Sequence, residues 1–253
     1  MFPIIQIGPM ALQAPGLILL IGLWLGLVVA ERLAPRFQAN SNNVYNLVFV
    51  ALIAGVLGAR VSFVLQNHEV FLKSPLNIFS LNPGLLDPFG GVAVGLIAVL
   101  VYGNRKKIAW RPTLDAITPF LSVMWIAVGI SNLASGDVFG AETSLPWGID
   151  LWGTVRHPTQ IYQILIGCII LGIIWPRTGS TSLVQKVPGE TFVGFLALSA
   201  GAWLIIEAFR GDSVVLSNGI RVTQVVAWLV LAVSLWGVGK LHQREQAANS
   251  GSL

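Results

Sequence analysis

The sequence predicts an all-α polytopic membrane protein with seven transmembrane helices, its N-terminus outside and its C-terminus cytoplasmic. Of the 253 residues, 55% are hydrophobic and only 10% are charged, whereas an ordinary soluble domain carries about 25% charged residues. The apolar residues form seven runs close to the roughly 20 residues that cross a bilayer. Between these runs, Lys and Arg alternate between an enriched and a depleted side of the membrane.

The composition also excludes several classes of protein and site. A net charge of +4 from 15 Lys and Arg against 11 Asp and Glu indicates a bias of membrane topology rather than a surface that binds nucleic acid. The single cysteine, Cys168, excludes a disulfide framework and a cysteine-rich metal site. No cofactor and no metal are expected.

The seven spans are expected to form one integral membrane domain over residues 1–253, with a polar tail from about residue 241. Pro119 lies in the fourth span, where it either starts or kinks the helix. Asp115 precedes that span and is expected to be its N-cap. The expected spans cover about residues 12–30, 44–65, 86–102, 116–133, 158–174, 191–209 and 222–239.

The distribution of basic residues gives the orientation. Ten of them fall on one side of the predicted spans and four on the other. The positive-inside rule assigns the richer side to the cytoplasm. The ten are Arg32, Arg36, Arg105, Lys106, Lys107, Arg111, Arg177, Lys186, Lys240 and Arg244; the four are Lys73, Arg156, Arg210 and Arg221.

Ionisable residues inside spans are costly and mark either function or pairing. Arg60 lies in the second span, and it either serves the function or is a structural partner for a carboxylate. Glu207 and Arg210 end the sixth span, and their spacing also fits a simple pair on one helical face.

Polar residues gather at the outer ends of two further spans. His157 opens the fifth span, followed by Pro158 at a favoured helix-starting position and by Gln160. Asn132 and Asp137 end the fourth span on the same side. Because these polar residues cluster around His157, a functional role for it is as well supported as a structural role.

Several of these residues belong to motifs that resemble the prolipoprotein diacylglyceryl transferase family. The most specific are Leu-Pro-Trp-Gly at residues 145–148 and His-Pro-Thr-Gln at residues 157–160. Gly-Ala-Arg at residues 58–60 and Glu-Ala-Phe-Arg at residues 207–210 occur in the same order as in the family. The resemblance covers nearly the whole chain and implies seven transmembrane helices with the N-terminus outside.

The resemblance implies a reaction at the outer leaflet of the bacterial cytoplasmic (inner) membrane. The diacylglyceryl group of phosphatidylglycerol would move to the lipobox cysteine thiol of a prolipoprotein signal peptide, releasing glycerol phosphate. Holding the lipid phosphate suits arginine, and the thiol must lose its proton before it attacks. By this comparison the catalytic candidates are His157, Asp137 and Glu207, and the headgroup-binding candidates are Arg60, Arg210, Asn132 and Gln160.

The chain departs from the family pattern at positions expected to bind phosphate or transfer protons. Gly129 and Trp203 replace arginines, Phe89 replaces a histidine, Pro15 a tyrosine and Gln163 a glutamate. A charge-assisted contact to phosphate contributes roughly 1.5–3 kcal/mol. An alternative function follows from these losses: a catalytically impaired family member that binds lipid, a related phospholipid or a lipoprotein.

Overall fold

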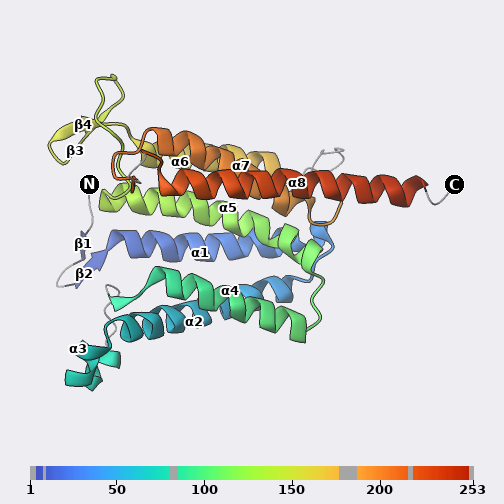
Figure 1. The fold of residues 1–253 in the computed structure, drawn as a ribbon, viewed down its shortest axis with the longest axis horizontal. Coiled ribbons are helices and arrows are strands. Elements are labelled where there is room, and N and C mark those ends of the chain that lie inside the picture. Colours follow the sequence, from blue (N-terminus) through green and yellow to red (C-terminus); the bar gives the residue numbers. More distant parts are fainter. Residues whose placement is uncertain (1–3, 8–9, 80–84, 177–186, 216–218, 251–253) are drawn as a thin grey trace.

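A computed structural model describes residues 4–7, 10–79, 85–176, 187–215 and 219–250. Helices dominate the chain, and two short hairpins lie outside them (Figure 1). In order, the elements are β1 (Ile4–Ile7), β2 (Met10–Gln13), α1 (Ala14–Leu33), η1 (Ala34–Phe37), α2 (Ser41–Gln66), α3 (His68–Lys73), η2 (Pro75–Phe79), α4 (Pro88–Arg105), α5 (Trp110–Ser135), β3 (Ile149–Leu151), β4 (Thr154–Arg156), α6 (Thr159–Ile174), α7 (Glu190–Ala208) and α8 (Val222–Ser250).

The all-α membrane architecture is confirmed. Six helices are long and apolar enough to cross a membrane: α1, α2, α4, α5, α7 and α8. Helix α6 has 16 residues, and at 1.5 Å per residue it is about 24 Å long, shorter than a hydrocarbon core of about 30 Å. A helix therefore occupies each of the seven expected runs, while the number of spans and the orientation of the termini stay predictions.

The long helices lie side by side in one bundle (Figure 1). Helices α2 and α4 pack together on one side, α6, α7 and α8 form the other side, and α1 and α5 lie between them. Glycines allow close approach of the backbones: a Cβ at Gly22 would lie 2.3 Å from the Cβ of Ala127, and one at Gly58 would lie 2.4 Å from the Cβ of Val94. Small residues at such contacts are typical of helices that associate in a membrane.

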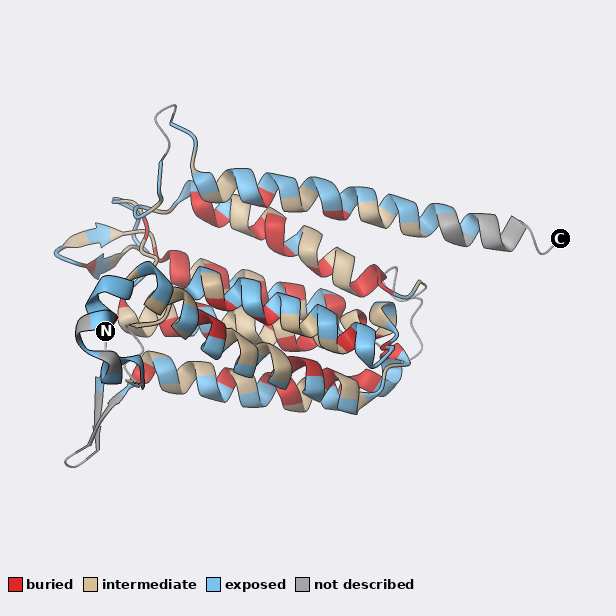
Figure 2. Cartoon of the chain, turned by 60° about the horizontal axis from the view of Figure 1, so that its bottom comes forward, coloured by how far each residue is buried: buried red, intermediate tan, exposed pale blue. Residues whose placement is uncertain are grey.

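The side chains sort by environment as expected for a bundle in lipid. Buried residues lie on the facing surfaces of the helices, and exposed ones cover the outside, including most of α8 (Figure 2). Many of the exposed residues are large and apolar, among them Leu20, Trp24, Ile53 and Leu229. Exposure of such an apolar surface to water would be unfavourable, whereas in a bilayer these side chains contact lipid tails.

Three helix ends differ from the expected ones. Leu12 lies in β2, so α1 begins at Ala14 and not at residue 12. Helix α5 begins at Trp110, before the expected start at 116, and continues through Pro119. The polar tail expected from about residue 241 continues α8 as a helix to Ser250.

The prediction for Asp115 was wrong in its choice of helix. Asp115 lies inside α5 and is 5% exposed. Its Oδ2 accepts a hydrogen bond from the Gly189 nitrogen at 2.6 Å, and its Oδ1 accepts one from the Phe192 nitrogen at 2.9 Å. The carboxylate therefore satisfies the free backbone N–H groups at the start of α7.

The two ends of the bundle carry different elements. Both hairpins and α3 lie at the end opposite the C-terminus (Figure 1), and we call this end the outer end after the orientation that the sequence predicts. The described basic residues of the enriched set lie at the other end, where α1, α4 and α8 finish and α5 begins. Arg177 and Lys186, which also belong to that set, lie outside the described residues.

Candidate functional site

A small network of backbone hydrogen bonds gathers three chain segments at the outer end. The Ala141 nitrogen donates to the Phe209 carbonyl at 2.7 Å, and the His157 nitrogen donates to the Ala141 carbonyl at 3.0 Å. The Gly211 nitrogen donates a third hydrogen bond, to the Phe139 carbonyl at 2.9 Å. The loop after α5, the start of α6 and the end of α7 are thereby held together.

Gly140 is required by this close approach. A Cβ at Gly140 would lie 2.2 Å from the His157 carbonyl oxygen and 2.5 Å from the His157 Cβ. Any larger residue would push the two segments apart. The position of His157 against α7 therefore depends on a glycine in the loop after α5.

His157 is half-buried among aromatic side chains. Its Nδ1 lies 3.3 Å from the Tyr162 hydroxyl, which also accepts a hydrogen bond from Nε1 of Trp147 at 3.0 Å. The centroid of the imidazole ring lies 5.1 Å from that of Phe209. His157, Tyr162, Trp147 and Phe209 line a cavity of about 370 Å³ together with Ile206, and its lining is mainly apolar.

Glu207 and Arg210 form an ion pair beside this cavity. Nη1 of Arg210 lies 3.3 Å from Oε2 of Glu207, whose side chain is fully buried. Nε of Arg210 also pairs with Oδ1 of Asp212 at 2.9 Å. Nη1 of Arg221 donates to the Glu207 carbonyl oxygen, so two arginines lie at the end of α7. The pair that the sequence spacing allowed is confirmed.

A second cavity, of about 570 Å³, is lined by other residues of α7 than the His157 cavity. Ser199, Ala200 and Trp203 of α7 line it, whereas Ile205, Ile206 and Phe209 line the first. Trp203 packs edge-to-face on Trp125 with 5.4 Å between ring centroids. The Arg210 guanidinium carbon lies 5.7 Å from the Trp203 ring centroid. Arg210 is therefore near the outer end of an apolar cavity.

Asn132, Asp137 and Gln160 meet where α5 ends and α6 begins. The Gln160 side chain is fully buried, and its Nε2 donates to the Asp137 carbonyl at 2.8 Å. The Asn132 carbonyl accepts from the Gly136 and Asp137 nitrogens at 2.8 and 3.1 Å. Asp137 is exposed. In these contacts Gln160 holds the loop, and its Oε1 is a buried acceptor with no hydrogen-bond partner.

Arg60 lies on α2, on the other side of the bundle from α7 (Figure 1). Its guanidinium donates to the carbonyl oxygens of Ile78 at 2.9 Å, Leu85 at 2.8 Å and Asn77 at 2.5 Å. Among the described residues no carboxylate pairs with Arg60, so that structural alternative was wrong. Arg60 instead ties α2 to η2 and to Leu85, which precedes α4.

Asp87 completes the polar contacts at that side of the outer end. It is the N-cap of α4 and accepts hydrogen bonds from the nitrogens of Phe89 and Gly90, both at 3.1 Å. The Ser62 hydroxyl donates to Oδ2 at 2.6 Å. The hydrogen bond from Ser62 lowers the pKa of the Asp87 carboxyl below its usual value more than any other contact does. The bonds from the two nitrogens and from Gln66 lower this pKa further.

The expected site residues thus fall into two groups. His157, Glu207 and Arg210 come together around the end of α7, with Asp137, Gln160 and Asn132 adjoining them through the loop after α5. Arg60 stands apart. The sequence interpretation missed Arg221, Tyr162 and Phe209 as members of the site; the only signal for Arg221 was its place in a polar turn directly before an apolar run.

Gly129 and Gln163, at two positions where the resemblance implies charged residues, lie between α5 and α6. A Cβ at Gly129 would lie 2.9 Å from Cγ1 of Ile164 and 3.4 Å from Cγ of Gln163. Nε2 of Gln163 donates to the Trp125 carbonyl at 3.1 Å. Helices α5 and α6 therefore pack tightly against each other at Gly129 and Gln163. Within the part of the chain that is described, no group of three His, Cys, Asp or Glu residues could hold a metal ion.

Comparison with known proteins gives one consistent answer. Residues 3–239 match the family model described as prolipoprotein diacylglyceryl transferase. A phosphatidylglycerol–prolipoprotein diacylglyceryl transferase of Corynebacterium diphtheriae is 23% identical and covers 97% of this chain and 94% of its own length. The enzyme of the same name from Clostridioides difficile is 26% identical over 84% of each chain, and that from Photobacterium profundum is 29% identical over 82% of this chain and 79% of its own.

Proposed function

The chain belongs to the prolipoprotein diacylglyceryl transferase family, and on that premise we propose that it moves a diacylglyceryl group from phosphatidylglycerol to the cysteine thiol of a prolipoprotein. In this reaction the thiolate sulfur attacks the glyceryl carbon that bears the phosphate. A thioether forms, the carbon–oxygen bond breaks, and glycerol phosphate leaves with the bonding electrons. The protein must therefore remove a thiol proton and stabilise negative charge on the leaving phosphate.

His157 is the proposed base for the thiol. It lines a cavity whose apolar walls suit the lipobox side chains of a signal peptide. If Nδ1 carries its proton toward the Tyr162 oxygen, 3.3 Å away, Nε2 keeps the lone pair that accepts the thiol proton. An imidazole side chain can accept a proton and release it again, which suits it to this transfer.

Arg210 is the proposed partner of the lipid phosphate. The apolar cavity beside Trp203 suits an acyl chain, and Arg210 lies close to that ring. Arginine binds phosphate oxygens through paired N–H donors. Glu207 would fix the Arg210 side chain through their 3.3 Å contact and would be the second candidate for proton transfer.

The remaining candidates are proposed in supporting roles. The exposed carboxylate of Asp137 is an alternative base, and Asn132 and Gln160 would orient the acceptor peptide. The hydrogen bond from Gln160 Nε2 to the Asp137 carbonyl, at 2.8 Å, supports that role because it fixes the loop beside the site. Arg60 stands apart from Arg210, and its proposed role is to hold its own loop while it adds positive charge to the outer end.

The site is proposed to face the outer leaflet of the bacterial inner membrane. Support comes from the basic residues at the opposite end of the bundle and the positive-inside rule. Prolipoprotein signal peptides would then meet the site at the surface to which they are exported.

The observation that carries this proposal is the arrangement of two apolar cavities along α7, one beside Trp203 and one beside His157, with the Glu207–Arg210 pair at the outer end of the helix. The test uses the purified full chain, phosphatidylglycerol and a lipobox peptide. Mass spectrometry should detect a thioether-linked diacylglyceryl peptide, and a peptide with serine in place of the cysteine should give none.

A second function is favoured by the packing at Gly129. The space beside this residue is closed by Ile164 and Gln163, and Trp203 packs on Trp125 in place of a family arginine. A site with fewer cations could retain lipid without transferring it. In that case the purified chain would carry phospholipid, and the lipobox peptide would stay unmodified.

A further inference from the structure

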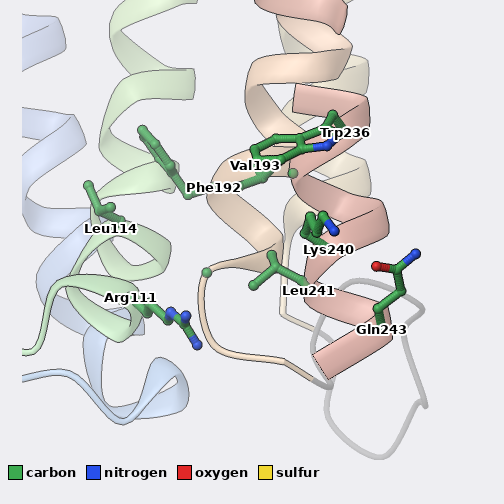
Figure 3. Close-up of a pocket in the computed structure, with 10 residues that line it drawn as sticks. Arg111, Leu114, Phe192, Val193, Trp236, Lys240, Leu241 and Gln243 are labelled. Atoms are coloured by element: carbon green, nitrogen blue, oxygen red, sulfur yellow. The ribbon is translucent and has the colours of Figure 1, made fainter. Parts of the chain in front are cut away.

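An elongated groove lies at the end of the bundle opposite the candidate site. It has a volume of about 600 Å³ and runs between the first turns of α5 and α7 and the later part of α8 (Figure 3). This volume is within the range of cavities that hold small molecules, roughly 300–1,000 Å³. The transfer reaction uses no residue of this groove.

The groove is apolar along its length and basic at its end. Phe192, Val193 and Trp236 line the part nearer the middle of the bundle, whereas Arg111 lies toward the end (Figure 3). Lys240 lies beside the groove on α8, with its Nζ 6.0 Å from the Trp236 ring centroid. This order matches a phospholipid, whose acyl chain and charged headgroup follow one another in the same way.

The two cations have no carboxylate partner among the ion pairs of the described residues. Two buried acidic side chains at this end, Asp115 and Glu190, are engaged elsewhere. Asp115 accepts hydrogen bonds from the start of α7, and Oε1 of Glu190 lies 3.2 Å from Nε2 of His242. Arg111 and Lys240 are both exposed, so their charges remain available to an anion.

The depth of the groove also fits a headgroup. The candidate membrane span in α8 ends at Gln243, close to Lys240, and α5 begins at Trp110. Tryptophan and lysine at the ends of transmembrane helices mark the interface between hydrocarbon and water. Arg111 and Lys240 therefore lie where lipid phosphates lie.

We propose that this groove binds an anionic phospholipid of the leaflet at the basic end of the bundle. One acyl chain would lie along Phe192, Val193 and Trp236, and the phosphate would contact Arg111 and Lys240. The site is separate from the proposed substrate site, which lies at the other end of α7. Its occupant would brace α7 and α8 against α5.

Photolabelling of the full chain in lipid vesicles tests the proposal. The probes are phosphatidylglycerol and phosphatidylcholine, each with a diazirine in one acyl chain, and mass spectrometry maps the labelled residues. The phosphatidylglycerol probe should label residues 111–114, 189–193 or 236–241 about tenfold more than the phosphatidylcholine probe. A tenfold preference corresponds to about 1.4 kcal/mol, which is within the roughly 2 kcal/mol that two cations contribute near an anionic surface.

Variants identify the cations. R111Q/K240Q should lose this preference, and R111K/K240R should keep it. The matched control is R105Q/K106Q, which removes two exposed cations at the same end but outside the groove and should label like the wild type. Equal labelling of the groove by both probes, labelling confined to the outer end, or an unchanged preference in R111Q/K240Q would overturn the proposal. The headgroup comparison on the wild-type chain decides the matter even where a variant does not fold.

Discussion

Nη1 of Arg210 lies 3.3 Å from Oε2 of Glu207, and this pair joins two residues one helical turn apart at the outer end of α7. The Glu207 side chain is fully buried, and that of Arg210 is 12% exposed. Residues of the same helix line two cavities, one beside Trp203 and one beside His157. The pair thus lies where a bound lipid and an incoming thiol would meet.

Arg210→Gln should lower the free energy of unfolding by roughly 3–5 kcal/mol, because it leaves a buried carboxylate without its partner. The double variant E207Q/R210Q should recover much of this loss, because it removes the unpaired charge. Denaturation in detergent measures both. Glu142→Gln is the control: its ion pair with Arg156 is largely exposed on the Glu142 side, so its loss should cost less than about 1 kcal/mol. Unchanged stability of R210Q would contradict a structural pair.

His157→Gln should abolish transfer, with a loss of at least about 100-fold, which is the usual contribution of a positioned base. The melting temperature should stay near that of the wild type, because glutamine can still donate toward the Tyr162 hydroxyl. The control is His68→Gln on α3, whose ring contacts only the Leu65 carbonyl at 3.3 Å among the described residues. Full activity of H157Q would show that His157 is not the base and has only a structural role at the start of α6.

Arg60→Ala should destabilise the chain and expose the segment after α3 to hydrogen exchange, because three carbonyl oxygens lose their donor. Arg60→Lys separates this role from headgroup binding. A single ammonium group keeps the charge but cannot reproduce the planar fork of donors, so R60K should exchange as fast as R60A at residues 77–79. Slow exchange in R60K would show that charge alone matters.

Gly129→Ala should lower the free energy of unfolding by about 1–3 kcal/mol, because its Cβ would lie 2.9 Å from Ile164 Cγ1. Gly129→Arg, which places the family's residue here, should lower it further. Gly172→Ala on the neighbouring helix is the control, since nothing lies within 4 Å of a Cβ there. A G129R variant that is both stable and more active would show that α5 and α6 can separate at this level.

Asp87 gives the outer end a dependence on pH. Hydrogen bonds, first from Ser62, lower the pKa of its carboxyl in the folded chain relative to the unfolded value of about 3.9. Its stabilising contribution is therefore complete above about pH 4 and is lost as the pH falls through the folded pKa. Asp87→Asn should flatten the fall in melting temperature between pH 5 and about pH 3 relative to the wild type. An identical pH profile in D87N would assign the acid sensitivity to other groups.

The positions of the long helices could be predicted from the sequence because each coincides with an apolar run. Their ends could not, because contacts between helices set them. Residues 110–115 contain Arg111 and Asp115, which a hydropathy pattern excludes from a span. The folded chain continues α5 through them because the Asp115 carboxylate is used by the start of α7.

Within the candidate site, only contacts between residues close together in the sequence could be predicted. The Glu207–Arg210 pair follows from a spacing of three residues on a helix. The contact of Arg60 with carbonyl oxygens, the Arg221 donor to Glu207 and the approach of His157 to Phe209 depend on how loops return to the bundle. One-dimensional periodicity carries no information on such contacts.

The measurement that tests the proposed activity most directly is the stoichiometry of its two products. Phosphatidylglycerol labelled in its headgroup glycerol is incubated with the purified chain and a lipobox peptide, and glycerol phosphate and thioether peptide are quantified together. Transfer predicts one glycerol phosphate for each thioether, and neither product with the cysteine-to-serine peptide. Retention of the labelled lipid by the chain, with neither product formed, would contradict transfer and favour a lipid-binding member of the family.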